Sequence, residues 1–191
     1  MYMIGKQKQN LWNVPNVLTM VRMALIPVYW VLILNGMPMK ALAVYVVASL
    51  TDVVDGYIAR KYNLITDFGK LMDPTADKLM VISVMLSMVI TDVIPLAPFV
   101  ILAAKEFLMM VGAACMLGKG QVVFAKWSGK LAQTVVVTSL VLCFFSDYFM
   151  SIGFPLHLYL IWVGVGLALY AFGYYVRMSI KILRESDQKA A

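Results

Sequence analysis

The 191-residue sequence is 62% hydrophobic and only 14% charged, with a formal net charge of +6 and a mean hydropathy of +0.84. A soluble domain is about half apolar and about a quarter charged, so this composition excludes a soluble domain, a disordered chain and a disulfide scaffold. It indicates an integral membrane protein, in which a basic excess sets topology and attracts anionic lipid, with no need for a nucleic-acid partner.

Apolar stretches follow one another along the whole chain, and a membrane-spanning helix needs about 20 residues. The chain has room for one all-α bundle of six transmembrane helices, separated by turn sequences such as Asn35-Gly36. The predicted spans are 16–35, 40–60, 67–91, 95–117, 127–149 and 155–182. Residues 1–15 are expected to form a cytoplasmic or interfacial N-terminal segment, 16–182 the six-helix domain and 183–191 a cytoplasmic tail.

Lysine and arginine gather at alternate ends of the predicted spans. They occur at both termini and in the second-to-third and fourth-to-fifth connections, whereas the other three connections hold only Lys40. By the positive-inside rule, both termini and these two basic connections are cytoplasmic. The sequence therefore predicts a multi-pass protein of the cell membrane.

Four of the ten acidic residues lie within 26 positions, at the facing ends of the second and third predicted spans. They are Asp52, Asp55, Asp73 and Asp77. A charged residue at mid-membrane costs roughly 2.5–3.5 kcal/mol, so a cluster of acids indicates a function and a compensating charge. Helical periodicity places the first two on one face and the last two on another, and the short connection predicts antiparallel neighbouring helices whose acidic faces meet.

The residues on these two faces favour a phosphate-binding metal site over an ion pathway. Carboxylate oxygens suit hard cations such as Mg²⁺, with Mn²⁺ or Ca²⁺ as alternatives, and four carboxylates can hold two ions. Gly56, Ala59 and Gly69 leave room for a bulky ligand, and Arg60 suits a phosphate. The predicted function is therefore chemistry on a lipid-linked diphosphate. A divalent-cation transporter is an alternative of a different class, but an ion pathway does not need a wide phosphate-binding surface.

The chain contains the pattern Asp52-x2-Asp55-Gly56-x2-Ala59-Arg60-x8-Gly69-x3-Asp73-x3-Asp77. At every position it resembles the signature of the CDP-alcohol phosphatidyltransferases. The resemblance implies a homodimer of six-helix protomers in a bacterial cell membrane, with its active site on the cytoplasmic side. It also implies transfer of a phosphatidyl group from CDP-diacylglycerol to an alcohol by direct displacement, releasing CMP without a covalent enzyme intermediate.

The same resemblance implies roles for individual residues. The four aspartates would bind two divalent cations, Mg²⁺ or Mn²⁺, and Asp77 would also be the general base that takes the proton of the acceptor hydroxyl. Other residues would bind CDP-diacylglycerol through its nucleotide or diphosphate: Asn16, Gly56, Ala59, Arg60, Thr66 and Gly69.

Further residues point to the acceptor alcohol. The run Asp73-Pro74-Thr75-Ala76-Asp77-Lys78 and the segment 13–22 look like those of phosphatidylglycerophosphate synthases, with cardiolipin-type synthases sharing the first. The resemblance therefore implies glycerol 3-phosphate as acceptor. The cations expected to bind it are Lys105, Lys126 and Lys130, with Arg22 more distant.

Two departures from that pattern leave the acceptor open. Lys105 stands where the pattern has arginine, and Ala132 stands where it has a second lysine. A dianionic acceptor needs several fixed cations, and lysine does not replace arginine at a bidentate site. Phosphatidylglycerol, which would make the protein a cardiolipin synthase, and a small neutral or zwitterionic alcohol stay as alternatives. Positive-inside anchoring would also explain Lys126 and Lys130, and a structural pair with Glu106 would explain Lys105.

Overall fold

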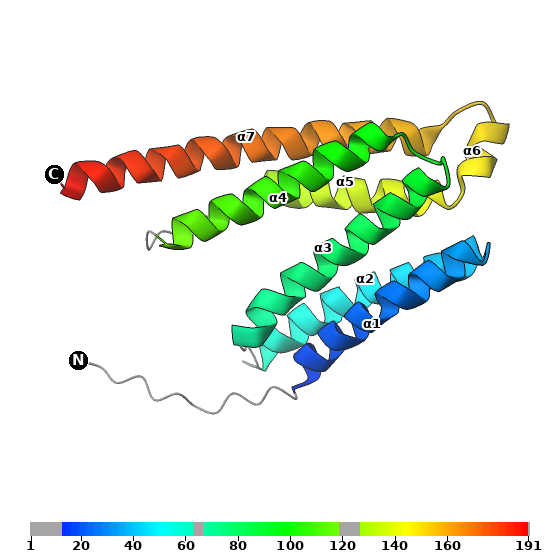
Figure 1. Ribbon diagram of the computed structural model, residues 1–191, viewed down its shortest axis with the longest axis horizontal. Helices are drawn as coiled ribbons and strands as arrows, with labels where there is room; N and C mark the ends of the chain where they lie inside the picture. The colour runs from blue at the N-terminus through cyan, green and yellow to red at the C-terminus, as the bar shows by residue number, and fades with distance from the viewer. Residues whose placement is uncertain (1–12, 63–66, 119–126, 191) are drawn as a thin grey trace. The chain divides into compact units, whose positions relative to one another are not determined.

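The computed structural model describes residues 13–62, 67–118 and 127–190 (Figure 1). Within these ranges the side chains at 52, 53, 56, 57, 59, 60, 67–71, 73, 74, 114, 117, 118 and 183–190 are outside the description. The described residues form helices and contain no strand, which confirms the all-α prediction. The helices are α1 (Val14–Leu34), α2 (Pro38–Lys61), α3 (Asp67–Ile90), α4 (Leu96–Gly118), α5 (Trp127–Cys143), α6 (Ser146–Ser151) and α7 (Leu156–Ala190).

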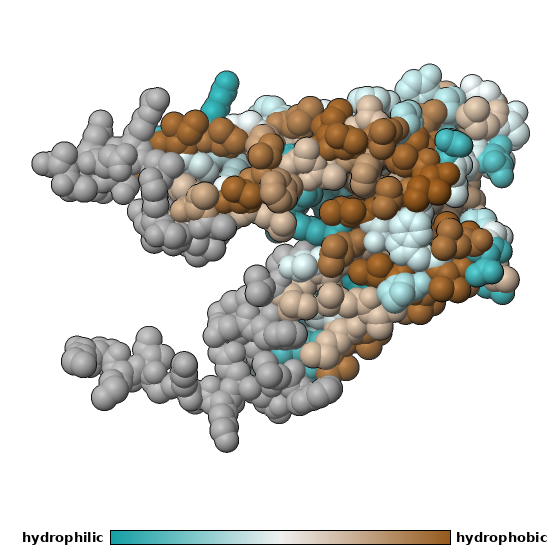
Figure 2. All heavy atoms as spheres, viewed as in Figure 1, coloured by the Kyte–Doolittle hydropathy of each residue, from teal (hydrophilic) through white to brown (hydrophobic). Residues whose placement is uncertain are grey.

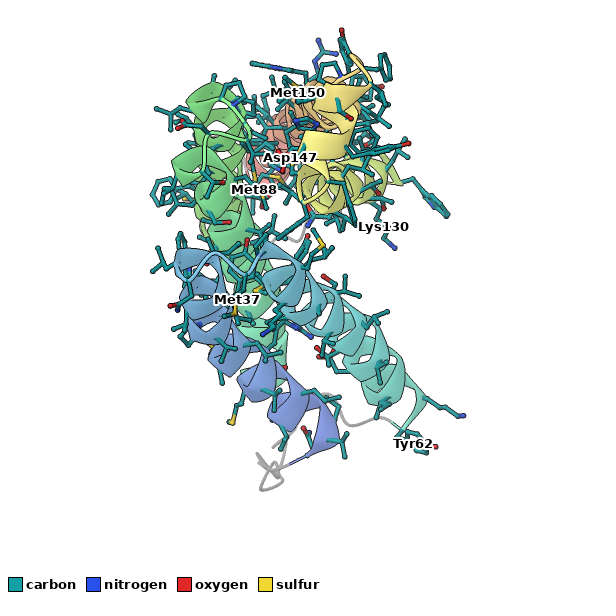
Figure 3. All side chains as sticks on the ribbon, turned by 90° about the vertical axis from the view of Figure 1, so that its right-hand side faces the viewer. Met37, Tyr62, Met88, Lys130, Asp147 and Met150 are labelled. Carbon is teal, nitrogen blue, oxygen red and sulfur yellow. The ribbon has the colours of Figure 1, made fainter. Side chains whose placement is uncertain are left out.

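Local sequence signals determine where α1 begins and ends. Asn13 caps the helix, because its Oδ1 accepts the backbone N–H of Asn16 at 2.9 Å. At the other end Gly36 has a φ of +68°, a conformation that glycine adopts without strain. The chain reverses there, Pro38 starts α2, and Figure 3 shows Met37 in the turn between these two neighbouring helices. The turn predicted at Asn35-Gly36 is therefore confirmed.

Three helices are long and apolar enough to cross a membrane within the described part of the chain: Val14–Leu34, Leu96–Ala113 and Leu156–Ile182. Two shorter apolar helices, Pro38–Thr51 and Trp127–Cys143, accompany them. Large apolar side chains lie on the outside of these helices; Leu34, for example, is 73% exposed. Figure 2 shows hydrophobic residues over much of the visible outer faces of α4 and α7. Such surfaces are stable in contact with lipid, so this is a membrane protein.

The observed helices differ from the predicted spans at two places. The predicted fifth span, 127–149, is interrupted, because α5 ends at Cys143 and α6 begins at Ser146. In the break the N–H groups of Phe144 and Phe145 donate to carbonyls three residues earlier, as in a tight turn. Hydropathy does not reveal this break, because both residues are strongly apolar. Helix α7 also continues beyond 182 to Ala190, through residues that favour helix.

The chain divides into two compact units, Met1–Ser87 and Met88–Ala191. In the first unit α1 packs against α2, and a 2.5 Å hydrogen bond between the Tyr29 hydroxyl and Ser87 Oγ joins α1 to α3. In the second unit α7 packs against α5 and α4. A Cβ on Gly164 of α7 would lie 2.8 Å from Cγ2 of Val136 on α5, so glycine permits the close approach of these two helices.

Candidate active site at the signature aspartates

The four signature aspartates lie on two helices of the first unit, as predicted. Asp52 and Asp55 are in the last three turns of α2, and Asp73 and Asp77 are in the first three turns of α3. The side chains of Asp55 and Asp77 are described, whereas those of Asp52 and Asp73 are not. The structure therefore describes one signature carboxylate on each helix, Asp55 on α2 and Asp77 on α3.

The Asp55 carboxylate is buried and forms an ion pair with Arg22 of α1. Nη2 of Arg22 donates to Oδ2 of Asp55 at 2.5 Å, and the two residues are 1% and 2% exposed. Charge-assisted hydrogen bonds of this kind are short and strong. A buried carboxylate is stable only when paired or coordinated, so Arg22 supplies part of the compensating charge that the acidic cluster requires.

Arg22 lies on the buried face of α1, where the buried polar residues of this helix are found. Asn16, Thr19 and Arg22 recur every three positions, and each is about 1% exposed. The opposite face exposes Val17, Val21 and other valines. This inside-out polarity is expected of a membrane helix that lines a functional interior. Asn16, which the sequence assigns to CDP-diacylglycerol, therefore shares a face with the arginine that contacts Asp55.

Asp77 of α3 interacts with α2. Its carboxylate, on a partly buried residue, interacts electrostatically with the phenol of Tyr45, which is 1% exposed. Tyr45 precedes Asp52 by about two turns of α2, since a turn takes 3.6 residues. The Tyr45 side of α2 therefore lies within electrostatic range of Asp77 on α3.

Sequence reasoning missed the contact of Arg22 with Asp55 and the electrostatic interaction of Tyr45 with Asp77. It offered Arg22 only as a more distant cation for the acceptor, and the structure adds its hydrogen bond to Asp55. A signal was present, because Arg22 is the one charged residue between positions 14 and 34. An isolated charge inside a predicted span indicates a partner of opposite charge. Tyr45 carried no comparable signal, because it is an uncharged residue in an apolar stretch.

The remaining residues predicted for CDP-diacylglycerol are not tested by side-chain geometry. Gly56, Ala59 and Arg60 lie on α2 and Gly69 lies on α3, at positions whose side chains are outside the description. Thr66 lies outside the described residues altogether. Their assignment stays a prediction of the signature.

The residues predicted for the acceptor belong to the second unit. Lys105 of α4 forms an ion pair with its neighbour Glu106, and their side chains are 13% and 21% exposed. Lys130, in the first turn of α5, is exposed, and Figure 3 shows its side chain pointing away from α5. Lys126 is outside the described residues. Lys105 is thus engaged by a carboxylate within its own unit.

The donor chemistry of the site fits divalent cations. Asp55 and Asp77 provide hard oxygen ligands, and each aspartate has two oxygens, so one oxygen can accept from arginine while the other faces a metal. Among the described side chains no group of three or more potential ligands occurs. The described side chains do not include those of Asp52 and Asp73.

A cavity of about 360 Å³ lies elsewhere, between α4 and α7 of the second unit. Its lining is mostly apolar and includes Leu108, Met116 and Phe172, with Ser179 and Tyr175 as polar members. Its described lining includes no acidic residue, so these residues do not provide the ligands that the predicted chemistry needs. The signature aspartates therefore remain the candidate active site.

Comparisons with known proteins agree with the signature. Residues 12–170 match the family model of the CDP-alcohol phosphatidyltransferases. A CDP-diacylglycerol–glycerol-3-phosphate 3-phosphatidyltransferase of Bacillus subtilis is 35% identical over 173 residues, covering 81% of this chain and 89% of the relative. A protein of the same name from Rickettsia typhi is 47% identical over 100 residues, covering 51% and 56%. A CMP-forming cardiolipin synthase of Streptomyces coelicolor is 33% identical over 111 residues, covering 55% and 52%.

Proposed function

Because this chain belongs to the CDP-alcohol phosphatidyltransferase family, we propose that it transfers the phosphatidyl group of CDP-diacylglycerol to glycerol 3-phosphate. The products are phosphatidylglycerophosphate and CMP. The observation that carries the proposal is the buried Asp55 on α2, held by Arg22 within a complete family signature. Family membership favours this transferase over the divalent-cation transporter considered as an alternative.

The proposed architecture is a six-span bundle in a bacterial cell membrane. The spans correspond to α1, α2, α3, α4, the pair α5–α6, and α7. The positive-inside distribution supports cytoplasmic termini and a cytoplasmic site, at the C-terminal end of α2 and the N-terminal end of α3. A homodimer is proposed from the family resemblance, with the lipid of the bilayer around it.

The proposed metal ligands are Asp52, Asp55, Asp73 and Asp77, holding two divalent cations, Mg²⁺ or Mn²⁺. Such ions, when bound, offset the negative charge of a diphosphate and of the departing phosphate. The support from this structure is the oxygen donor chemistry of Asp55 and Asp77 and their position on neighbouring helices. Charge this concentrated in a membrane interior is stable only with cations beside it.

The protein's own groups carry the remaining roles in the transfer. Asp77 accepts the proton of the acceptor hydroxyl, whose oxygen attacks the β-phosphorus of CDP-diacylglycerol. The bond from that phosphorus to the bridging oxygen breaks, and the oxygen leaves with CMP. Binding residues hold the donor so that attack is in line with the leaving oxygen. The proposed donor-binding set is Asn16, Gly56, Ala59, Arg60, Thr66 and Gly69.

Phosphatidylglycerol is the second candidate acceptor, and one observation favours it. The proposed acceptor site consists of Lys105, Lys126 and Lys130, but Lys105 already pairs with Glu106. A pocket with fewer available cations suits a phosphodiester better than the dianionic glycerol 3-phosphate. The similarity to a cardiolipin synthase over about half of the chain is consistent with this alternative.

A panel of acceptors distinguishes these functions. Purified protein in lipid nanodiscs receives CDP-diacylglycerol, Mg²⁺ and one acceptor: glycerol 3-phosphate, phosphatidylglycerol, serine or inositol phosphate. Mass spectrometry identifies the lipid product. A lipid product with glycerol 3-phosphate and with no other acceptor supports the proposal. Cardiolipin formed with phosphatidylglycerol supports the alternative. The absence of a product with every acceptor refutes both.

A further inference from the structure

Arg22 and Asp55 connect α1 to α2 at the candidate active site. They are 33 positions apart in the sequence, yet Nη2 of Arg22 lies 2.5 Å from Oδ2 of Asp55. Their side chains are 1% and 3% exposed, so water screens the pair very little. Asp55 belongs to the family signature, which begins at Asp52, whereas Arg22 lies in the segment 13–22, whose resemblance implies no contact with the aspartates.

The chemistry of arginine suits it to hold a carboxylate in one orientation. Its guanidinium is planar, stays charged under all physiological conditions and offers several N–H donors in a rigid fork. A carboxylate bonded to it loses rotational freedom. A carboxylate in a defined orientation is what a metal site requires, and the partners that orient metal ligands affect metal affinity strongly.

We propose that Arg22 is a positioning residue for phosphatidyl transfer, which holds the Asp55 carboxylate in one orientation between α1 and α2 for a divalent cation. The proposal depends on the proposed function, because it takes Asp55 to be a metal ligand. In this proposal Arg22 acts through Asp55, a role different from that of the distant acceptor cation expected from the sequence.

Two physical roles of Arg22 predict opposite effects on metal affinity. If Arg22 only neutralised negative charge, its removal would leave the aspartates more negative and Mn²⁺ would bind more tightly. If Arg22 orients Asp55, its removal leaves the carboxylate disordered or displaced, and Mn²⁺ binds more weakly. Loss of an orienting partner typically weakens metal binding by about 10–100-fold. The direction of the change therefore decides between the roles.

The experiment measures Mn²⁺ binding by electron paramagnetic resonance in the full-length protein in nanodiscs. The variants are Arg22→Lys and Arg22→Met, and Arg177→Met, an exposed arginine of α7, is the matched control. We expect the Mn²⁺ Kd to rise about 10-fold or more in Arg22→Lys and further in Arg22→Met, as for other metal sites that lose an orienting partner. The control should keep the wild-type Kd. Where Arg22→Met does not fold, Arg22→Lys decides, because it keeps the charge and loses only the planar fork.

Each outcome either supports the positioning role or overturns it. An unchanged Kd in Arg22→Lys, or tighter Mn²⁺ binding in Arg22→Met, overturns it. Asp55→Asn separates this failure from failure of the proposed metal site. If Asp55→Asn loses Mn²⁺ binding while the Arg22 variants keep it, only the positioning role fails. If Asp55→Asn binds Mn²⁺ as the wild type does, the metal assignment of Asp55 and the role of Arg22 both fail.

Discussion

Replacing Arg22 by methionine is expected to destabilise the protein through the carboxylate that it leaves behind. Arg22 and Asp55 are 1% and 2% exposed, so water does not reach Asp55 to replace the lost guanidinium. Removing one partner of a buried ion pair typically costs about 3–5 kcal/mol. For a chain of this size that corresponds to a Tm lower by roughly 6–20 °C, at about 2–4 °C per kcal/mol.

The same reasoning predicts that a second substitution restores much of the stability. Asp55→Asn in the Arg22→Met background removes the uncompensated charge, and replacing both members of a buried pair is often close to neutral. The double variant should therefore melt well above Arg22→Met and near the wild type. The order of Tm values, rather than any single value, identifies the buried charge as the cause.

The two cysteines provide the assay. Cys143 is buried and Cys115 is exposed, so in a Cys115→Ala background a thiol-reactive dye reports unfolding through Cys143. Each variant is melted in detergent with this reporter. A Tm of Arg22→Met within about 2 °C of the wild type would mean that removal of the guanidinium costs less than about 1 kcal/mol. That result would refute the reasoning that Asp55 is a buried carboxylate dependent on Arg22.

Three further changes test other parts of the account. Asp77→Asn should lower kcat for CMP release by about 10²–10⁴-fold, as expected for loss of a general base, and near-normal turnover would remove Asp77 from that role. Lys130→Ala should raise the KM for glycerol 3-phosphate much more than the KM for CDP-diacylglycerol; an unchanged acceptor KM would mean that this lysine only anchors α5. Gly164→Ala should lower the stability by about 1–3 kcal/mol, because its Cβ meets the stiff side chain of Val136 at 2.8 Å. Gly166→Ala, with nothing within 4 Å, is the control, and equal Tm values for the two would contradict close packing of α5 and α7.

Features that depend on local sequence were predictable. The helices follow apolar runs bounded by asparagine, glycine and proline, and the turn at Gly36 needs only the left-handed backbone that glycine favours. The positions of Asp52, Asp55, Asp73 and Asp77 on α2 and α3 follow from helical periodicity. The pairing of Lys105 with Glu106 is also predictable, because the two residues are neighbours in the sequence.

Features that depend on tertiary contacts or on backbone geometry were not predictable from one sequence. The contact of Arg22 with Asp55 joins residues on different helices, and nothing in the spacing of either helix identifies the partner. The separation of α6 from α5 occurs within an apolar run, where Phe144 and Phe145 give no turn signal. The electrostatic interaction of Asp77 with Tyr45 similarly depends on how α3 is rotated against α2.

The central claim is that the signature aspartates catalyse transfer from CDP-diacylglycerol to glycerol 3-phosphate. The most direct measurement is a time course of CMP and phosphatidylglycerophosphate formed by the purified wild-type protein and by Asp77→Asn, each with Mg²⁺ and with a chelator. We predict that the two products appear in equal amounts in the wild type, and that both disappear with the chelator and nearly disappear in the variant. CMP release without phosphatidylglycerophosphate, or equal product formation in Asp77→Asn, would contradict the account.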